Sequence, residues 1–444
     1  MHERETQLAE APIKKLLWKL SAPAMVGMLV MALYNLVDTI FIGRAVGILG
    51  IAGIAIVFPI HMLIMAIEQT IGIGGASFIS RKLGERKLEE TEFALGNIVS
   101  LVVVSSIVMT ALGLIFIKPL LIVFGATDTI LPLAIEYARI IILGIVFFSF
   151  GMVGSTLVRA EGNAKVAMVI MLIGAVLNII LDPILIFGFD MGMAGAAWAT
   201  VLSQIATCLY VLYYFATGKS LLKFYLKNLK LKFYIVKEIV VIGISSFVRM
   251  GSSSIMAMVL NNSLAIYGGD IAIGVFGIIN RLLAFVFLPL IGIVQGMQPI
   301  VGYNFGAGAV DRVKETVRLS IKLTTYSAIG AFLVLEIFPK QLLQIFTSDP
   351  DAIKMGILAM RVVALAFATI GFQIVSGGLY QALGRAKESL FLSSLRQVIL
   401  LIPLVIILPH FWGLLGIWIA FPVADSLAGG ITWWMYKREM GVLK

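Results

Sequence analysis

The sequence predicts an all-α integral membrane protein with twelve transmembrane helices in two pseudo-symmetric lobes of six. Three observations lead to this fold class: the apolar composition, the even spacing of long apolar segments, and an internal duplication. Of the 444 residues, 60% are hydrophobic and only 13% are charged. A helix needs about 20 mainly apolar residues to cross a bilayer, and this chain contains many such runs.

Twelve segments are apolar and long enough to span a membrane. The first is preceded by acidic residues and is itself of spanning length, so it does not resemble a cleavable signal peptide. The predicted segments are 16–42, 50–78, 91–116, 134–158, 166–187, 193–216, 236–266, 272–301, 314–338, 354–382, 388–409 and 414–436.

The net charge of +10 is an orientation signal rather than a nucleic-acid footprint. Lysine and arginine concentrate in the N-terminal segment, in alternate connections and in the C-terminal tail. The remaining connections hold only Arg44, Lys118, Lys340 and Lys354. Because cytoplasmic loops carry the Lys/Arg excess, both termini are predicted to be cytoplasmic in a multi-pass protein of the cell membrane.

An enzyme is not expected. The single cysteine, Cys208, lies in an apolar segment, and none of the three histidines has a recognisable nucleophile partner. The sequence Gly218-Lys219-Ser220 resembles the end of a phosphate-binding loop, but position 213 is a tyrosine where that motif needs glycine. No other nucleotide-binding motif is visible, which favours an ion gradient over ATP as the energy source.

The two halves of the chain repeat each other. Residues 160–165 align with 382–387 at an offset of 222, and Leu83-Gly84 aligns with Phe305-Gly306 at the same offset. Gly192-x-x-Gly195 aligns with Gly413-x-x-Gly416 at 221, and Pro183 with Pro403 at 220. Each half has an even number of spans, so the repeats are parallel. Transporters built this way bind substrate between their halves.

The repeat divides the chain into an N-lobe (1–216), a cytoplasmic linker (217–237) and a C-lobe (238–444). The linker mixes lysines with leucine, phenylalanine and tyrosine. It reads equally as a plain connector or as an amphipathic segment on the anionic inner leaflet.

The strongest functional signal is an aspartate, Asp182, inside an apolar run. An ionisable group at membrane depth almost always faces a protein interior or a water-filled path. Asn178 lies four residues earlier and shares its helix face. Pro183 has no N–H, so the carbonyl of Ile179 loses its helical donor. With the Thr200 hydroxyl from the next helix, these oxygens suit a hard cation.

A second acid, Asp38, lies in the first span, one turn after Tyr34 and near Asn35. Two carboxylates that meet in a low-dielectric site cannot both stay ionised unless a cation neutralises them. Asp38 and Asp182 are therefore predicted to couple transport to H⁺ or Na⁺. The alternative for Asp38 is a structural role at a kink or beside an arginine.

Other polar residues at membrane depth are candidates for the cavity. Glu68 either faces the cavity or pairs with a basic residue such as Arg249, Arg281 or Arg396. Asp425 aligns near Gln204 and is either a second polar site or part of helix packing. In the second half the counterpart of Asp38 falls near Leu260 to Asn262 and that of Asp182 near Ile402, and both acids are missing there, so ion coupling is expected in the N-lobe alone.

The chain resembles the MATE (multidrug and toxic compound extrusion) family, most closely its MepA-like prokaryotic branch. The resemblance covers both halves and rests on six segments taken together. They are YNLVDTIFIGRAVG at 34–47, RAEGNAK at 159–165, NIILDP with GMAGAAWAT within 178–200, QPIVGYNFGAG at 298–308, QALGRAK at 381–387 and GLLGIWIAFPVAD at 413–425.

The resemblance implies a monomeric antiporter that exports cationic or amphipathic organic compounds without a cofactor, in exchange for Na⁺ or H⁺. It places the cation or proton site at Asp38, Asn178, Asp182 and Thr200. A lipid or lipid-linked saccharide flippase of the same superfamily is the competing hypothesis. Such a flippase would use membrane-depth arginines for an anionic substrate, and Arg249, Arg281, Arg361 and Arg396 keep it open.

Overall fold

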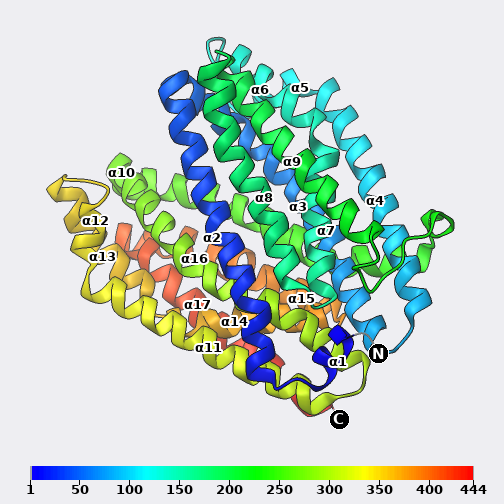
Figure 1. The fold of residues 1–444 in the computed structure, drawn as a ribbon. Coiled ribbons are helices and arrows are strands. Elements are labelled where there is room, and N and C mark those ends of the chain that lie inside the picture. Colours follow the sequence, from blue (N-terminus) through cyan, green and yellow to red (C-terminus); the bar gives the residue numbers. More distant parts are fainter. Residues whose placement is uncertain (1–2, 444) are drawn as a thin grey trace.

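The computed structural model describes residues 3–443, which fold almost entirely into helices (Figure 1). The first half contains helices α1 to α9. Their bounds are α1 (Glu3–Glu10), α2 (Ile13–Ala45), α3 (Ile48–Gly84), α4 (Leu88–Ile115), α5 (Ile117–Val123), α6 (Leu131–Leu143), α7 (Ile145–Ala160), α8 (Ala164–Pro183), the π-helix η1 (Ile184–Gly188) and α9 (Gly192–Ala216).

The second half follows a connecting segment that contains the short helix η2 (Leu226–Leu229). Its elements are α10 (Phe233–Gly306), α11 (Val310–Ile337), α12 (Pro339–Gln344), α13 (Pro350–Ala364), α14 (Phe367–Ala382), α15 (Ala386–Ser394), the π-helix η3 (Leu395–Leu401), α16 (Ile402–Ile407) and α17 (Pro409–Val442).

The described residues contain the twelve predicted spans. Nine helical segments are long and apolar enough to cross a membrane, and two bent pairs, α6 with α7 (54°) and α13 with α14 (51°), each make one further span. Helix α10 has 74 residues, about 110 Å at 1.5 Å per residue, far more than one crossing needs. It breaks at Gly269 (φ 65°) and so supplies two spans.

The duplication is visible in the backbone itself. The left-handed conformation at Gly269 recurs at Gly47 (φ 76°), 222 residues earlier, where α3 begins. Gly162 (φ 81°) and Gly384 (φ 73°) form a second pair at the same offset. A side chain is strained at such angles, so glycine is favoured at each turn. The two bent spans, α6–α7 and α13–α14, occupy equivalent places in the two halves.

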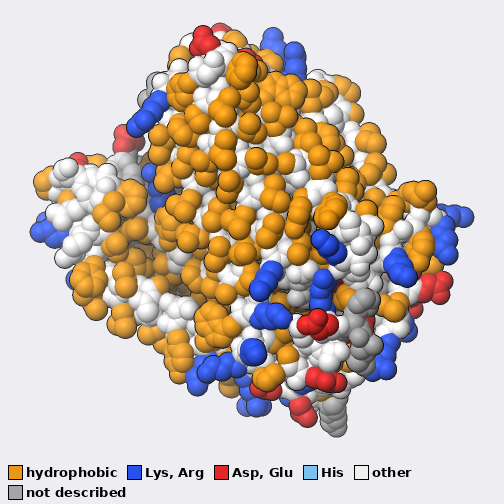
Figure 2. Space-filling view, viewed as in Figure 1, with side chains coloured by type: hydrophobic (Ala, Val, Ile, Leu, Met, Phe, Trp, Pro, Cys, Tyr) orange, Lys and Arg blue, Asp and Glu red, His pale blue; other side chains and the backbone are white. Residues whose placement is uncertain are grey.

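The two lobes share one hydrophobic core at one end only. At the end where α1 and the end of α17 lie, called the terminal end below, buried residues of both halves form a single cluster that includes Leu17, Phe78, Met297 and Val317 (Figure 1). Toward the opposite end each lobe has its own core. The surface is hollowed between the two bodies there, and charged side chains gather at the terminal end (Figure 2).

The lobes meet at the terminal end through glycines. A Cβ at Gly84 would overlap the carbonyl oxygen of Tyr303, and one at Gly306 would overlap that of Arg81. Gly84 and Gly306 are equivalent in the repeat, so they mark the pseudo-twofold axis. Along α3 and α10, Gly74 and Gly243 likewise sit against backbone carbonyls of the other lobe. Small residues allow this close approach between helices.

We expect Gly306→Ala to destabilise the protein by about 1–3 kcal/mol, because the added methyl group must displace the α3 backbone. Gly330→Ala is the matched control, since Gly330 lies in α11 with open space around it and alanine is the better helix former. Thermal unfolding of both variants in detergent tests this. Equal midpoints for the two variants would contradict the packing.

The segment between α9 and α10 is attached to the N-lobe at the terminal end. The Asn97 side chain on α4 donates to the carbonyl of Asn228 (3.2 Å) and accepts from the N–H of Lys232 (2.6 Å). Glu161, just after α7, is fully buried and accepts from the Ser220 hydroxyl (2.6 Å) and the Leu221 N–H (2.8 Å). The segment is therefore anchored to protein along its length.

Glu161 also contacts the N-terminal helix α1. Its Oε2 lies 3.9 Å from the guanidinium of Arg4 and accepts from the Tyr214 hydroxyl (3.3 Å). Burial raises the pKa of Glu161 to about 7, although its hydrogen bonds and Arg4 act in the opposite direction. The folded protein thus binds this proton more tightly than a solvent-exposed glutamate does.

Attachment of the 217–232 segment should therefore weaken as pH rises through about 7. A proton on Glu161 stabilises the anchored state, and this stabilisation is complete below the pKa of an ordinary glutamate. It is lost once Glu161 ionises in the folded protein. Hydrogen exchange of residues 217–232, corrected for intrinsic rates, should show protection that falls as the pH rises from about 4.5 to about 7 and levels off above that value. Glu161→Gln cannot ionise and should abolish the pH dependence, whereas Glu92→Gln, on α4, should leave it in place.

Candidate ion-coupling site

Helices α2 and α8 bring the two predicted carboxylates together. Asp38 lies in the last third of α2, and Asp182 lies in the last turn of α8. Asp182 is fully buried, and its carboxyl group lies close enough to that of Asp38 for the two to interact directly. Two carboxyl groups can share a hydrogen bond only when one of them carries a proton. Their proximity therefore favours a proton or a cation between them.

Asn178 and Thr200 join the same cluster. The Asn178 amide nitrogen donates to Asp182 (3.4 Å) and to the Thr200 hydroxyl (3.3 Å). The Thr200 hydroxyl in turn donates to the carbonyl of Ala196 within α9 (3.0 Å). The spacing of four residues between Asn178 and Asp182 thus places both on the face of α8 that meets α9, as the sequence predicts.

Several buried oxygens of this cluster have no hydrogen-bond donor. They are Oδ1 of Asp38, Oδ1 of Asn178, Oδ2 of Asp182 and Oε1 of Gln204. An unsatisfied buried acceptor costs about 1–3 kcal/mol, so several in one place call for a proton or a cation. Within residues 3–443 no three His, Cys, Asp or Glu side chains converge. Any metal ion here would depend on amide and hydroxyl oxygens.

Pro183 shapes the backbone beside Asp182. The α-helix ends at this proline and continues as the π-helix η1, in which the Phe189 N–H bonds to the carbonyl of Ile184 (3.0 Å). Such π-turns are frequent at functional sites because they widen the helix locally. In the second half, the equivalent span also contains a π-helix, η3, but it lies before Pro403.

Tyr137 belongs to the cluster and was missed in the sequence. It lies on α6, is 9% exposed, and its hydroxyl lies near that of Thr200. Tyr34 and both carboxyl groups lie close enough to Tyr137 to interact electrostatically with it. The sequence did not indicate a role for Tyr137, because its position depends on the bend between α6 and α7, which the sequence did not predict. Gln204 lies one turn after Thr200, at the α6–α7 bend beside Gly144.

Three other candidates lie outside the cluster. Asn35 is exposed on α2 and donates to the carbonyl of Met31 (2.7 Å). Glu68 is fully buried inside the N-lobe and accepts from the Ser105 hydroxyl (3.1 Å), and among the described residues it pairs with no arginine. Asp425 is buried in the C-lobe and forms an ion pair with Arg396.

Comparison with known proteins agrees with this architecture. The MatE family profile matches residues 23–184 and 245–407, which covers one stretch in each half. The chain belongs to the MatE family. The multidrug export protein MepA of Staphylococcus aureus (strain MSSA476) is 28% identical over 418 residues, 94% of this chain and 92% of MepA. MepA of Staphylococcus haemolyticus (strain JCSC1435) is 27% identical over the same length.

Solved MATE structures have the same two-lobe fold. The MATE multidrug transporter DinF-BH, solved in complex with a ligand, is 47% identical with a TM-score of 0.90, covering 97% of this chain and 96% of that one. A MOP superfamily transporter from Pyrococcus furiosus is 28% identical with a TM-score of 0.92, covering 99% and 98%. Its binding pocket is described as having reverse polarity. The chain is thus a multi-pass membrane protein with a transport role rather than an enzyme.

The carboxyl pair gives a spectroscopic prediction. Infrared difference spectra between acidic and alkaline samples should contain a band of protonated carboxyl groups that is lost on alkalinisation. Asp38→Asn and Asp182→Asn should each remove this contribution, because the remaining carboxylate has no second carboxylate with which to share a proton and can accept from the asparagine amide instead. Asp351→Asn, at an exposed position in α13, should leave it unchanged. An unaltered band in both cluster variants would contradict proton sharing.

Proposed function

We propose that this MATE transporter is a proton-coupled antiporter that exports cationic or amphipathic organic compounds by alternating access between its two lobes. The observation that carries the proposal is the close pair of carboxyl groups, Asp38 and Asp182, surrounded by buried oxygens that have no donors. A protonated pair has little attraction for an organic cation, whereas the ionised pair attracts one. Proton and substrate therefore compete for one negative field.

The proposed orientation follows from the charges. With the Lys/Arg-rich terminal end in the cytoplasm, the separate cores of the two lobes lie toward the outside. The described conformation would then be closed to the cytoplasm and open outward. In this proposal residues 1–216 and 238–444 move as two units, 217–237 links them, and the transporter acts as a monomer without a cofactor.

Proton coupling is favoured over sodium coupling by the contact between the carboxyl groups. Sodium would need both carboxylates ionised and several oxygen ligands arranged around it. Asp38, Asn178, Asp182 and Thr200 offer oxygens for that, so sodium remains the alternative coupling ion. Two carboxyl groups that lie this close suit a shared proton instead.

Two of the four arginines on which the flippase hypothesis rests are paired with acidic residues in the structure. Arg396 is neutralised by Asp425, and Arg361 pairs with Glu336 (3.4 Å). Arg249 and Arg281 remain exposed on α10. A carboxyl cluster in the N-lobe suits positively charged substrates better than anionic lipid headgroups.

Efflux of a fluorescent organic cation from proteoliposomes tests the proposal, with a pH gradient and a sodium gradient imposed separately. Wild-type protein should respond to the pH gradient alone. Asp182→Asn should abolish the gradient-driven component, because Asp38 no longer has a second carboxyl group with which to share a proton. The control Asp351→Asn, at an exposed position of α13 in the other lobe, should export as the wild type does.

The other outcomes are equally informative. A response to the sodium gradient alone would mean that sodium is the coupling ion, and the assignment of the site would stand. Normal efflux by Asp182→Asn would remove the site assignment. No response to either gradient, with labelled anionic lipid crossing the bilayer instead, would establish the flippase function.

A further inference from the structure

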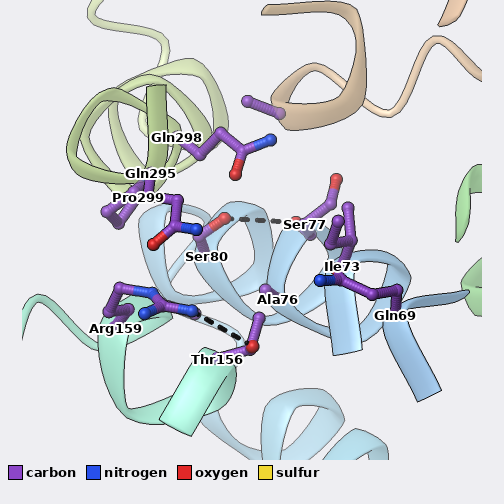
Figure 3. A pocket seen from close by; sticks show the side chains of 12 residues that line it. Gln69, Ile73, Ala76, Ser77, Ser80, Thr156, Arg159, Gln295, Gln298 and Pro299 are labelled. Carbon is purple, nitrogen blue, oxygen red and sulfur yellow. Dashed lines mark hydrogen bonds between the residues drawn. The ribbon is translucent and has the colours of Figure 1, made fainter. Parts of the chain in front are cut away.

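A polar cavity of ≈ 60 Å³ lies between the two lobes near the terminal end (Figure 3). Helices α3 and α7 of the first half form one part of its wall, and α10 and α14 of the second half form the other. Its polar lining includes Gln69, Ser77, Ser80, Arg159, Gln295 and Gln298, and no carboxylate lines it. It is separate from the carboxyl cluster, which none of these residues joins.

Arg159 brings a positive charge to this cavity without a negative partner. Its guanidinium donates to the Thr156 hydroxyl (3.2 Å) on its own helix. Within residues 3–443 it forms no ion pair. The nearby Glu161 is bound to the connecting segment and Arg4, and Glu238 is bound to Arg81 (2.8 Å). Arg159 is partly buried, and its guanidinium has five N–H donors, so the Thr156 contact leaves most of them available to a ligand.

The side chains around Arg159 can supply further donors. Gln295 has a buried oxygen without a hydrogen-bond partner, so no contact among the described residues fixes the orientation of its amide. One N–H of Gln298 donates to Gln381 (2.8 Å), which is itself held by Ser245 and Ser246. The other N–H of Gln298 is left for a ligand. In Figure 3 the side chains of Arg159, Gln295 and Ser80 approach one another from three helices.

We propose that this cavity binds a small oxyanion, a phosphate or carboxylate group, with Arg159 as its charge partner and the Gln295 and Gln298 amides as additional donors. A cavity of this volume holds about four waters, which matches a phosphate-sized group but not a whole drug. The guanidinium fork fits the oxygens of either group.

The proposed anion bridges the lobes. Arg159 belongs to the first half, whereas Gln295 and Gln298 belong to the second. The complete site therefore exists only while the terminal ends of the lobes are packed together. A ligand that binds one conformation better shifts the population toward it. The anion should thus stabilise the described conformation and oppose separation of the lobes at the terminal end.

Binding of ³³P-labelled inorganic phosphate tests the site by equilibrium dialysis, using the full-length protein in nanodiscs of zwitterionic lipid. We expect saturable binding that weakens at least tenfold in Arg159→Gln. Arg438→Gln removes an equal charge from an exposed position of α17 and should bind like wild type. If Arg159→Gln does not yield folded protein, Gln298→Leu and Arg159→Lys replace it, with weakening expected in the first and retained binding in the second.

Two further arms identify the source of the anion and its effect. Competition by formate indicates a general carboxylate and phosphate site, whereas loss of phosphate binding in nanodiscs of anionic lipid identifies the lipid headgroup as occupant. Spin labels at Lys87 and Glu315, on opposite lobes of the terminal end, should shift toward the shorter distance when phosphate is added. The absence of saturable binding of either anion, or equal binding by Arg159→Gln and Arg438→Gln, would overturn the proposal.

Discussion

The close approach of the two lobes around Gly84 and Gly306 is the constraint on which the remaining structure depends. These glycines are equivalents in the repeat and face backbone carbonyls of the opposite lobe, so any larger residue would push the lobes apart. Because packing at this end is so tight, the hydrophobic core is continuous here and divided elsewhere. The duplication thus does more than double the number of helices. It places identical small residues on the axis, where two copies of one surface must fit each other.

The two halves have kept the same backbone but not the same chemistry. Bent spans, left-handed glycines and π-helices recur in both. The carboxyl pair exists only in the first half, because the positions equivalent to Asp38 and Asp182 hold no acid in the second. The C-lobe acid Asp425 is neutralised by Arg396 and its backbone oxygen accepts from Gln373 (2.9 Å). One lobe therefore carries a titratable site, and the other provides a packed partner against which it moves.

Sequence reasoning was sufficient wherever the information is periodic or local. Apolar run length predicts the twelve spans, the spacing of four predicts that Asn178 and Asp182 share a face, and the charge of Asp38 and Asp182 predicts that they meet. It failed where position depends on bends and long-range contacts. Tyr137 reaches Thr200 because α6 and α7 bend by 54°, and Glu161 joins three distant segments. Glu68 has its serine partner, Ser105, on another helix, α4, which no local pattern encodes.

Helix α2 connects the carboxyl cluster to the contact between the lobes. Its first half packs against the other lobe, where Ser21 and Met25 lie directly on Gly296 and Gly292 of α10. Its second half carries Asp38 to Asp182 on α8. A change in charge at the carboxyl pair alters the force that holds the outer part of α2 to the N-lobe. The other end of the same helix packs against the second lobe. The force can therefore change the relative position of the lobes through α2 alone, with no further residues needed to connect the two places.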